Sequence, residues 1–275
     1  MIVIPIKTEY IKANEGYEKI IDSVKEICQE NDYLIISETP ISTAEGNLLD
    51  ESKYNPGLLA IFLADIWSKY IWGYILCPLF GCKKRTKKNL RKMPKEVRNH
   101  KQLILKEYGL KYALQPTAEA GVDLSNVPEQ YVSLLPKNPE KSAKIIKDEI
   151  KRITNKNIHV LIIDTDGTYQ FHNIKYTTLP IAIKGIISGT GVFGYMLRKF
   201  SKKIGPTVLA STIQLDVIDL IKLANIAEKC EKNSNDNFFG TIYDMKNKFD
   251  SNFSDISSEM LNSVSHVPAV LIKNK

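Results

Sequence analysis

Cysteine is scarce in this chain of 275 residues, and its scarcity excludes one class of protein. Four cysteines are too few and too scattered for the disulfide framework of a small secreted domain, so a reducing compartment is expected. The N-terminus lacks a basic region followed by a long apolar stretch and a cleavage site, so no secretory leader is expected. The sequence predicts a folded, cytoplasmic chain. The cysteines are Cys28, Cys77, Cys82 and Cys230.

The common catalytic and nucleotide-binding motifs are also missing. The chain has no Walker loop, GxGxxG, HExxH or GxSxG sequence, which removes the familiar nucleotide and hydrolase signatures. The pair Cys77 and Cys82 stands apart from other ligand types, and such cysteines are more often small apolar fillers than ligands. The four histidines show no metal-ligand spacing; they are His100, His159, His172 and His266.

Positive charge is concentrated in one segment. Residues 83–101 hold ten Lys and Arg residues against Glu96 alone, more than the whole net charge of +7. Such a patch can attract phosphate, anionic lipid or an acidic substrate, and a solvated helical face explains it equally well. Nucleic acid is disfavoured as a partner because no interleaving of aromatic and basic residues accompanies the patch.

Directly before the basic segment, residues 57–81 form the longest apolar stretch of the chain. Its length suits a bilayer, but Asp65, Ser68 and Lys69 lie in the middle, where a charge costs ~2.5–3.5 kcal/mol. We therefore expect an amphipathic helix that packs on the core or lies on a surface, rather than a membrane span.

Strand and helix patterns alternate irregularly along the chain, which favours an α+β fold. Helices are expected over 16–30, from Pro56 to Pro78 and Gly81, within 83–101 with a break at Pro94, over 141–154 and over 213–227. A polar loop is expected at 38–47, a turn at 164–168 and a loose insertion at 231–263. Strands are expected over 2–6, 32–37, 110–118, 159–163 and 267–272.

Acidic residues occur at the ends of these expected strands. Asp164 follows four apolar residues and begins a tight sequence with Thr165, Asp166 and Gly167. Carboxylates at a rigid strand end suit a hard cation such as Mg²⁺ held with phosphate oxygens, although Asp-x-Asp-Gly is also ordinary turn chemistry. Asp123 and Glu45 lie in two further acidic turns, and each alone is equally consistent with a capped turn.

The order and the sequences of these segments resemble those of the coenzyme F420-0:γ-glutamyl ligase family. The resemblance covers most of the chain as a single domain over 1–275, apart from 57–112 and 231–263, which we interpret as insertions. The matching segments are Ile41-Ser-Thr-Ala-Glu-Gly46, Ala120-Gly-Val-Asp-Leu-Ser-Asn-Val127, Leu134-Leu-Pro-Lys-Asn-Pro-Glu-Lys-Ser-Ala143, Ile163-Asp-Thr-Asp-Gly167 and Val267-Pro-Ala-Val-Leu-Ile272.

The resemblance implies an α+β fold in an intertwined homodimer and a ligase that uses GTP or ATP with Mg²⁺ or Mn²⁺. In that chemistry an acyl phosphate forms on the acceptor carboxylate, and the amine of glutamate displaces the phosphate. Asp123 and Asp164 match the family's catalytic, metal-binding aspartates, joined by Thr165 and by Glu231 or Glu228. The positions carried over to the nucleotide are Ser42, Glu45, Gly46, Ser125, Asn126, Asp166 and Gly167.

Several family positions have changed. Thr43, Asn47 and Thr168 stand where the family usually has Lys or Arg, and Glu119 stands where it tends to have Asn. Lost cations remove charge-assisted hydrogen bonds to anions, so substrate recognition is expected to be rebuilt. The acceptor is then the deazaflavin precursor, a folate or another small carboxylate.

The alternative hypothesis is a non-catalytic scaffold that kept the fold. In that case residues 57–101 would contact an anionic membrane surface or a partner protein, and the protein would be membrane-peripheral. The cations would supply attraction and the aromatic residues an interfacial anchor, although packing in the core also explains the aromatic residues. These residues are Trp67, Tyr70, Trp72 and Tyr74.

Overall fold

Two strands with continuous apolar runs, over residues 34–36 and 160–163, form the centre of the protein. The computed structural model describes residues 2–234, 242–252 and 255–274. Strand β2 (Tyr33–Ser37) pairs in parallel with β5 (His159–Phe171), and β8 (His266–Ile272) lies antiparallel along the other side of β2. Strands buried on both faces lack the alternation of polar and apolar residues, which is why these segments are continuous apolar runs.

The central sheet is mixed, as the α+β prediction requires. Its strand order is β1-β8-β2-β5-β6, with β7 paired to β5. The added strands are β1 (Val3–Thr8), β6 (Ile174–Thr177) and β7 (Lys202–Ser211). The turn expected at 164–168 was wrong: β5 continues through it, and the register against β7 shifts between Asp164 and Gly167 instead. Asp164 and Asp166 lie at this irregularity of the β5–β7 pairing.

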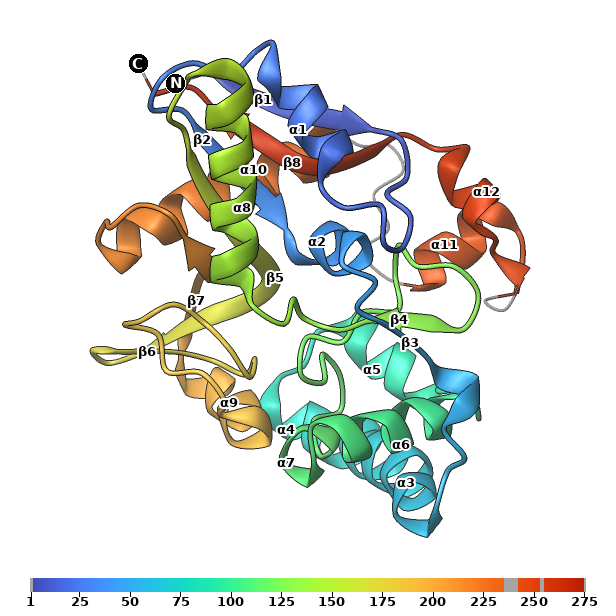
Figure 1. The fold of residues 1–275 in the computed structure, drawn as a ribbon. Helices are drawn as coiled ribbons and strands as arrows, with labels where there is room; N and C mark the ends of the chain where they lie inside the picture. Colours follow the sequence, from blue (N-terminus) through green and yellow to red (C-terminus); the bar gives the residue numbers. More distant parts are fainter. Residues whose placement is uncertain (1, 235–241, 253–254, 275) are drawn as a thin grey trace.

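Helices cover both faces of this sheet (Figure 1). The helices α1 (Glu18–Lys25) and α8 (Pro139–Thr154) pack on the face formed by Leu34, Val160 and Leu271. The helix α10 (Val217–Ser234) packs on the opposite face, which alternate strand residues form. The helices expected over 16–30, 141–154 and 213–227 are confirmed, with shorter ends in the first and a later start and end in the last.

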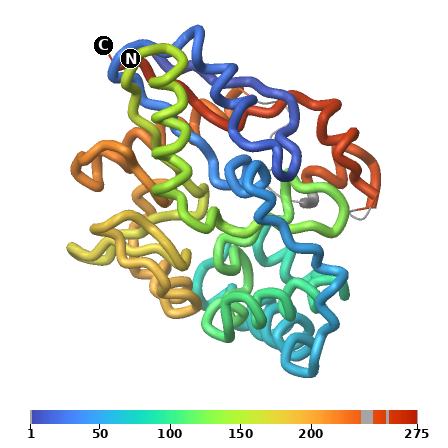
Figure 2. Tube along the Cα trace, viewed as in Figure 1, coloured from blue at the N-terminus to red at the C-terminus, as the bar shows by residue number. Residues whose placement is uncertain are grey.

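A second, mostly helical region lies beyond the end of the sheet, drawn in cyan and green in Figure 2. One long helix runs through α3 (Leu58–Phe62), the π-helical η2 (Leu63–Leu76) and α4 (Cys77–Phe80), and it ends at Gly81 with φ +71°. Only glycine adopts that left-handed conformation without strain. The break at Pro94 is confirmed, because α5 (Lys84–Arg91) and α6 (Val97–Glu107) lie on either side of it.

Three further expectations about secondary structure were wrong. Residues 38–47 contain a buried helix, α2 (Glu38–Ala44), rather than a polar loop. Residues 110–118 begin with the short helix α7 (Leu110–Ala113) rather than a strand. In 231–263 the structure shows the end of α10, then α11 (Ile242–Phe249) and α12 (Ser258–Asn262), while 235–241 and 253–254 lie outside the described residues.

The remaining elements connect the two regions. Strand β3 (Leu48–Asp50) precedes the helical region in the chain, and β4 (Tyr131–Ser133) follows it. The two strands pair as a small antiparallel sheet at the point where the chain enters and leaves that region. A short 3-10 turn, η1 (Glu51–Lys53), follows β3, and α9 (Gly191–Leu197) with η3 (Arg198–Phe200) follows β6. Cys77 and Cys82 form a disulfide across the end of the long helix, so the filler interpretation of this pair was wrong.

Candidate active site

The parallel pairing of β2 and β5 brings two acidic residues together. Ser37 lies opposite Ile163 in the register, so the next residues, Glu38 and Asp164, lie side by side where the pairing of β2 with β5 ends. Both side chains are buried, at 8% and 4% exposure. Ligand sites in α/β sheets form at the carboxyl ends of parallel strands for this reason.

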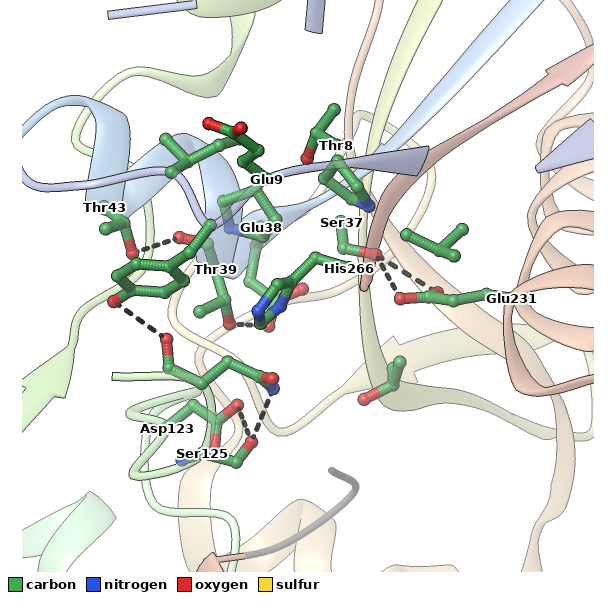
Figure 3. A pocket seen from close by; sticks show the side chains of 17 residues that line it. Thr8, Glu9, Ser37, Glu38, Thr39, Thr43, Asp123, Ser125, Glu231 and His266 are labelled. Carbon is green, nitrogen blue, oxygen red and sulfur yellow. Dashed lines mark hydrogen bonds between the residues drawn. The ribbon is translucent and has the colours of Figure 1, made fainter. Parts of the chain in front are cut away.

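Asp123 reaches the same edge from a loop. Its backbone N–H and carbonyl form two hydrogen bonds with the backbone of Ser133, the last residue of β4. Its carboxylate accepts hydrogen bonds from the backbone N–H of Ser125 at 2.8 Å and from the Ser125 hydroxyl at 2.7 Å (Figure 3). This serine therefore orients the aspartate while leaving lone pairs of both oxygens for a ligand.

A fourth carboxylate comes from α10 on the other face of the sheet. The hydroxyl of Ser37 donates to both oxygens of Glu231 at 3.3 Å, which places Glu231 on the cavity side of the strand end (Figure 3). Glu228, the other candidate for this position, instead forms an ion pair with Lys232. Of the two glutamates, Glu231 is the one that lies at the site.

The electrostatics of these groups reflect crowding of like charges. Burial, together with the nearby Asp123 carboxylate, raises the pKa of Glu38 to about 8. Burial also raises the pKa of Glu231 to about 7, and burial with the charge of Glu38 holds the pKa of Asp164 well above its usual range. Burial raises the pKa of Asp123 as well. Such shifts mark a cluster that a bound cation would stabilise.

Two cavities meet at this acidic cluster. A small one of about 110 Å³ is lined by Ser37, Thr39 and Glu231, and a larger one of about 860 Å³ by Asp164 and Asp166. The residues common to both linings are Glu38, Asp123 and Thr165. The larger volume is that of a small-molecule site, and a group bound there would lie against the carboxylates.

The donor set suits a hard divalent cation in kind. It consists of carboxylate and hydroxyl oxygens, and the Oε2 atom of Glu38 is buried without a hydrogen-bond partner among the described residues. In that same part of the chain, no three acidic, histidine or cysteine side chains are close enough to hold a metal ion as they stand. The arrangement therefore offers ligands and an unsatisfied oxygen, but not a finished coordination sphere.

The other residues predicted for the site divide into two groups. Ser125 and Asn126 line the small cavity, and Thr165 is exposed to both cavities. Four other predicted residues, all of them described, do not line either cavity: Ser42, Glu45, Gly46 and Gly167. Glu45 is engaged elsewhere, since it accepts hydrogen bonds from the hydroxyls of Tyr17 and Ser142.

The residues that replace family cations have structural partners. The Thr43 hydroxyl donates to the carbonyl of Thr39 at 2.9 Å, within α2. The Asn47 amide donates to the carbonyl of Leu135 at 2.7 Å. Thr168 is fully buried and donates to the Pro206 carbonyl and the Thr207 hydroxyl. Each of these three side chains is neutral and forms a hydrogen bond to a backbone carbonyl of the protein.

Glu119 belongs to a buried charged network that the sequence did not suggest. The Lys101 ammonium is fully buried and donates to Glu119 at 2.7 Å and to the carbonyls of Ala113 and Gln115. His100 lies between Glu51 at 2.5 Å and Glu119 at 3.8 Å. A solvated helical face was one of two equally weighted interpretations of the basic run 83–101, whereas Lys101 within it is one of the most buried residues.

The charges in this network determine its protonation. Burial alone would lower the pKa of His100, but the carboxylates of Glu51 and Glu119 outweigh it and raise that pKa to about 10. Burial alone would raise the pKa of Glu119, but Lys101 and His100 outweigh it and lower that pKa to about 2. His100, Glu51 and Glu119 line the larger cavity, so helix α6 supplies one wall of the site.

Glu38 is the main site residue that sequence reasoning missed. It follows the apolar strand β2 directly, as Asp164 follows the apolar part of β5, so the same signal was present at both strand ends. The polar residues within 38–47 suggested a loop, and the parallel pairing of β2 with β5 was not anticipated. Comparing the residues that follow each apolar run would have identified it.

The sequence is similar to those of known proteins. The sequence profile described as F420-0:Gamma-glutamyl ligase matches residues 5–237. The chain is 42% identical to a Methanocaldococcus jannaschii protein named Uncharacterized protein MJ1361, over 98% of this chain and 96% of that protein. It is 28% identical to the Coenzyme F420:L-glutamate ligase of the same organism, over 72% of this chain and 70% of that enzyme. It is 31% identical to the Coenzyme F420:L-glutamate ligase of Methanococcus maripaludis, over 61% of each. The chain therefore belongs to the F420-0:gamma-glutamyl ligase family.

Proposed function

We propose that this protein is an amide ligase that joins L-glutamate to a small carboxylate at the expense of GTP or ATP. Membership of a family of glutamate ligases supports the reaction class. The observation that carries the proposal is the cluster of Glu38, Asp123 and Asp164 at the meeting point of two cavities. A reaction between two small molecules and a triphosphate needs such a junction, with like charges that a metal ion can neutralise.

In the proposed reaction an oxygen of the acceptor carboxylate attacks the terminal phosphorus of the nucleotide. The bond to the bridging oxygen breaks, which yields an acyl phosphate and a nucleoside diphosphate. The glutamate nitrogen then attacks the acyl carbon, inorganic phosphate leaves, and the nitrogen loses a proton. The acyl group is therefore activated by the phosphate rather than by a protein nucleophile.

Mg²⁺ or Mn²⁺ would be held by Asp123 and Asp164, with Thr165, Glu231 and the newly found Glu38 nearby. When bound, the cation would offset the negative charge of the phosphates. The chain itself contributes rigidity: Ser125 fixes the Asp123 carboxylate, and the Asp166 N–H donates to Asp164 at 2.6 Å. Preorganised carboxylates need little rearrangement on binding.

We further propose that the acceptor differs from that of the F420:L-glutamate ligases. Methanocaldococcus jannaschii has a protein of that name at 28% identity and another protein at 42% identity to this chain. The neutral Thr43, Asn47 and Thr168 point the same way, because an acceptor with fewer negative charges needs fewer cations. A folate and another small acid are the candidates, and the deazaflavin precursor is the comparison that this proposal expects to be the poorer acceptor.

The scaffold alternative is less well supported. A protein that only binds a partner has no need for four carboxylates with raised pKa values at one strand edge, and each such group costs stability. Self-association as a homodimer remains a prediction from the family resemblance, and a cytoplasmic location remains a prediction from the cysteine content. Size-exclusion chromatography with light scattering tests the first of these.

The test starts from binding. Melting temperatures of the wild-type protein are measured with GTP or ATP, each with and without Mn²⁺, and with Asp123→Asn and Asp164→Asn variants. A ligand that binds only the folded state raises the melting temperature by mass action. We expect a metal-dependent rise that both variants lose. Asp219→Asn is the matched control, because Asp219 forms an exposed ion pair with Lys222.

Turnover is then followed as inorganic phosphate released in the presence of glutamate and each candidate acid. Release that needs both glutamate and one acid, with a product heavier by one glutamyl unit in mass spectrometry, identifies the acceptor. A nucleotide-induced shift that is equal in wild type, Asp123→Asn and Asp164→Asn would refute the assignment of the site. No shift with either nucleotide would favour the scaffold.

A further inference from the structure

The solvent-facing side of the long helix 58–80 is apolar throughout. Its nine exposed positions carry no charged side chain, and three of them are strongly exposed: Leu58 at 88%, Ile75 at 62% and Leu79 at 62%. We name these nine positions the apolar stripe. They are Leu58, Leu59, Phe62, Ile66, Tyr70, Tyr74, Ile75, Pro78 and Leu79.

The charged and polar residues of the same helix point into the protein. Asp65 forms an ion pair with Arg98 of α6, and the Lys69 ammonium donates to the Met93 carbonyl at 3.2 Å. Ser68 is fully buried. Helices on the surface of soluble proteins usually expose their charges and bury their apolar side, so this helix is reversed.

Basic side chains border the stripe near its C-terminal end. The Arg91 guanidinium of α5 lies 4.5 Å from the centre of the exposed Tyr74 ring, which in turn stacks on Tyr70. The exposed Lys199 of η3 donates to the Leu79 carbonyl at 2.9 Å and lies beside the exposed Phe200 ring. Tyrosines beside Lys or Arg are typical of the interface between lipid headgroups and acyl chains.

We propose that the apolar stripe docks the protein on an anionic bilayer surface, with the helix lying in the plane of the interface. The stripe would enter the region between headgroups and acyl chains, while Arg91, Lys199 and the cations of α5 would contact phosphates. A second copy of the chain fits less well, because an interface symmetric about the stripe would bring these same cations together.

The packing of the helix favours an in-plane position over a membrane span. By length and composition Leu58–Phe80 is long and apolar enough to cross a bilayer, and a third of it is buried inside the protein. The Trp67 indole donates to the Leu114 carbonyl at 2.7 Å, and Trp72 is fully buried between Leu90 and Cys77. Crossing a bilayer would break these contacts, whereas docking leaves them intact.

The experiment is co-sedimentation of the full chain with vesicles of phosphatidylglycerol and phosphatidylcholine, and with vesicles of phosphatidylcholine alone. We expect binding to the anionic vesicles that weakens with added salt. The double variant Ile66→Gln, Ile75→Gln should reduce this affinity about tenfold or more, because polar side chains do not enter the acyl region. Lys199→Gln should reduce it about fivefold, the contribution of one cation near an anionic surface.

A matched control removes the same chemistry elsewhere. Ile174 and Ile187 are exposed at 51% and 56% outside the helix, so Ile174→Gln, Ile187→Gln should bind vesicles like the wild type. Equal binding by the stripe variant and this control overturns the proposal, as does a wild-type protein that stays in the supernatant. A wild-type dimer that the stripe variant alone dissociates, without vesicle binding, would assign the stripe to a second copy.

Discussion

Removal of one charge from the acidic cluster should stabilise the metal-free protein. In the folded state the pKa of Glu38 is raised from 4.5 to about 8, mainly by burial and then by Asp123. The folded protein therefore holds a proton that the unfolded chain has lost above its own pKa, and the free energy of unfolding falls as pH rises through this window. One pKa unit corresponds to about 1.4 kcal/mol, so the loss reaches on the order of 4 kcal/mol by about pH 8.

The perturbation is Glu38→Gln, which keeps the shape of the side chain and removes its charge. Unfolding in urea is followed from about pH 5 to about pH 9 in the presence of EDTA. The wild-type free energy of unfolding should decline across this range. The variant should lose the part of the decline that Glu38 contributes and keep the parts from Glu231 and His100, whose pKa values are also raised. The variant should also be the more stable protein at the alkaline end, because Asp164 is relieved of a neighbouring charge.

Two comparisons make the result decisive. Glu149→Gln removes an exposed carboxylate that pairs with Arg152, so its free energy of unfolding should depend on pH as that of the wild type does. Mn²⁺ should restore wild-type stability at alkaline pH, and Glu38→Gln should gain less from it. A wild-type free energy that is flat between about pH 5 and about pH 9, or a Glu38→Gln variant with the wild-type slope, would refute the reasoning.

The buried network and the disulfide give three further expectations. Lys101→Met leaves Glu119 without its main counter-charge and should lower the free energy of unfolding by about 3–5 kcal/mol in urea titrations. Because the folded pKa of His100 is raised from 6.5 to about 10, its stabilisation is complete below about pH 6.5 and should disappear toward about pH 10. A His100→Gln variant measured by thermal denaturation should therefore lose less stability than the wild type between about pH 6.5 and about pH 10. Cys82→Ser opens a short loop and should cost about 2 kcal/mol under oxidising conditions, with no difference from wild type once dithiothreitol has reduced the disulfide.

The elements that the sequence predicted correctly are those where burial dictates composition. The segments 32–37, 159–163 and 267–272 are apolar because both faces of the sheet are covered, and that pattern is visible without a structure. The amphipathic helix 141–154 is equally visible from its spacing. Asp123 and Asp164 were predicted from the family resemblance, and their role as metal ligands stays a prediction.

The elements that sequence reasoning missed depend on contacts between distant segments. Helix α2 consists largely of polar residues, which predict exposure. Glu38, Thr39 and Thr43 are nevertheless buried, and all three line the small cavity of the candidate site. Lys101 sits in a run of cations that predicts a solvated face, and only the fold shows that Glu119 lies opposite it. Pairing across long sequence separations is not encoded in any local pattern.

The strand order of the central sheet has a consequence for biosynthesis. β8, formed by residues 266–272, lies between β1 and β2, and both of those strands come from the first part of the chain. Until β8 emerges from the ribosome, β1 and β2 each have an edge without a pairing strand, and such edges are templates for aggregation. Glu38 follows β2 directly, so the edge of the sheet that carries the candidate site can only become rigid once residues 266–272 have been translated. Translation that stops before residue 266 should therefore yield an aggregation-prone product rather than a partially active enzyme.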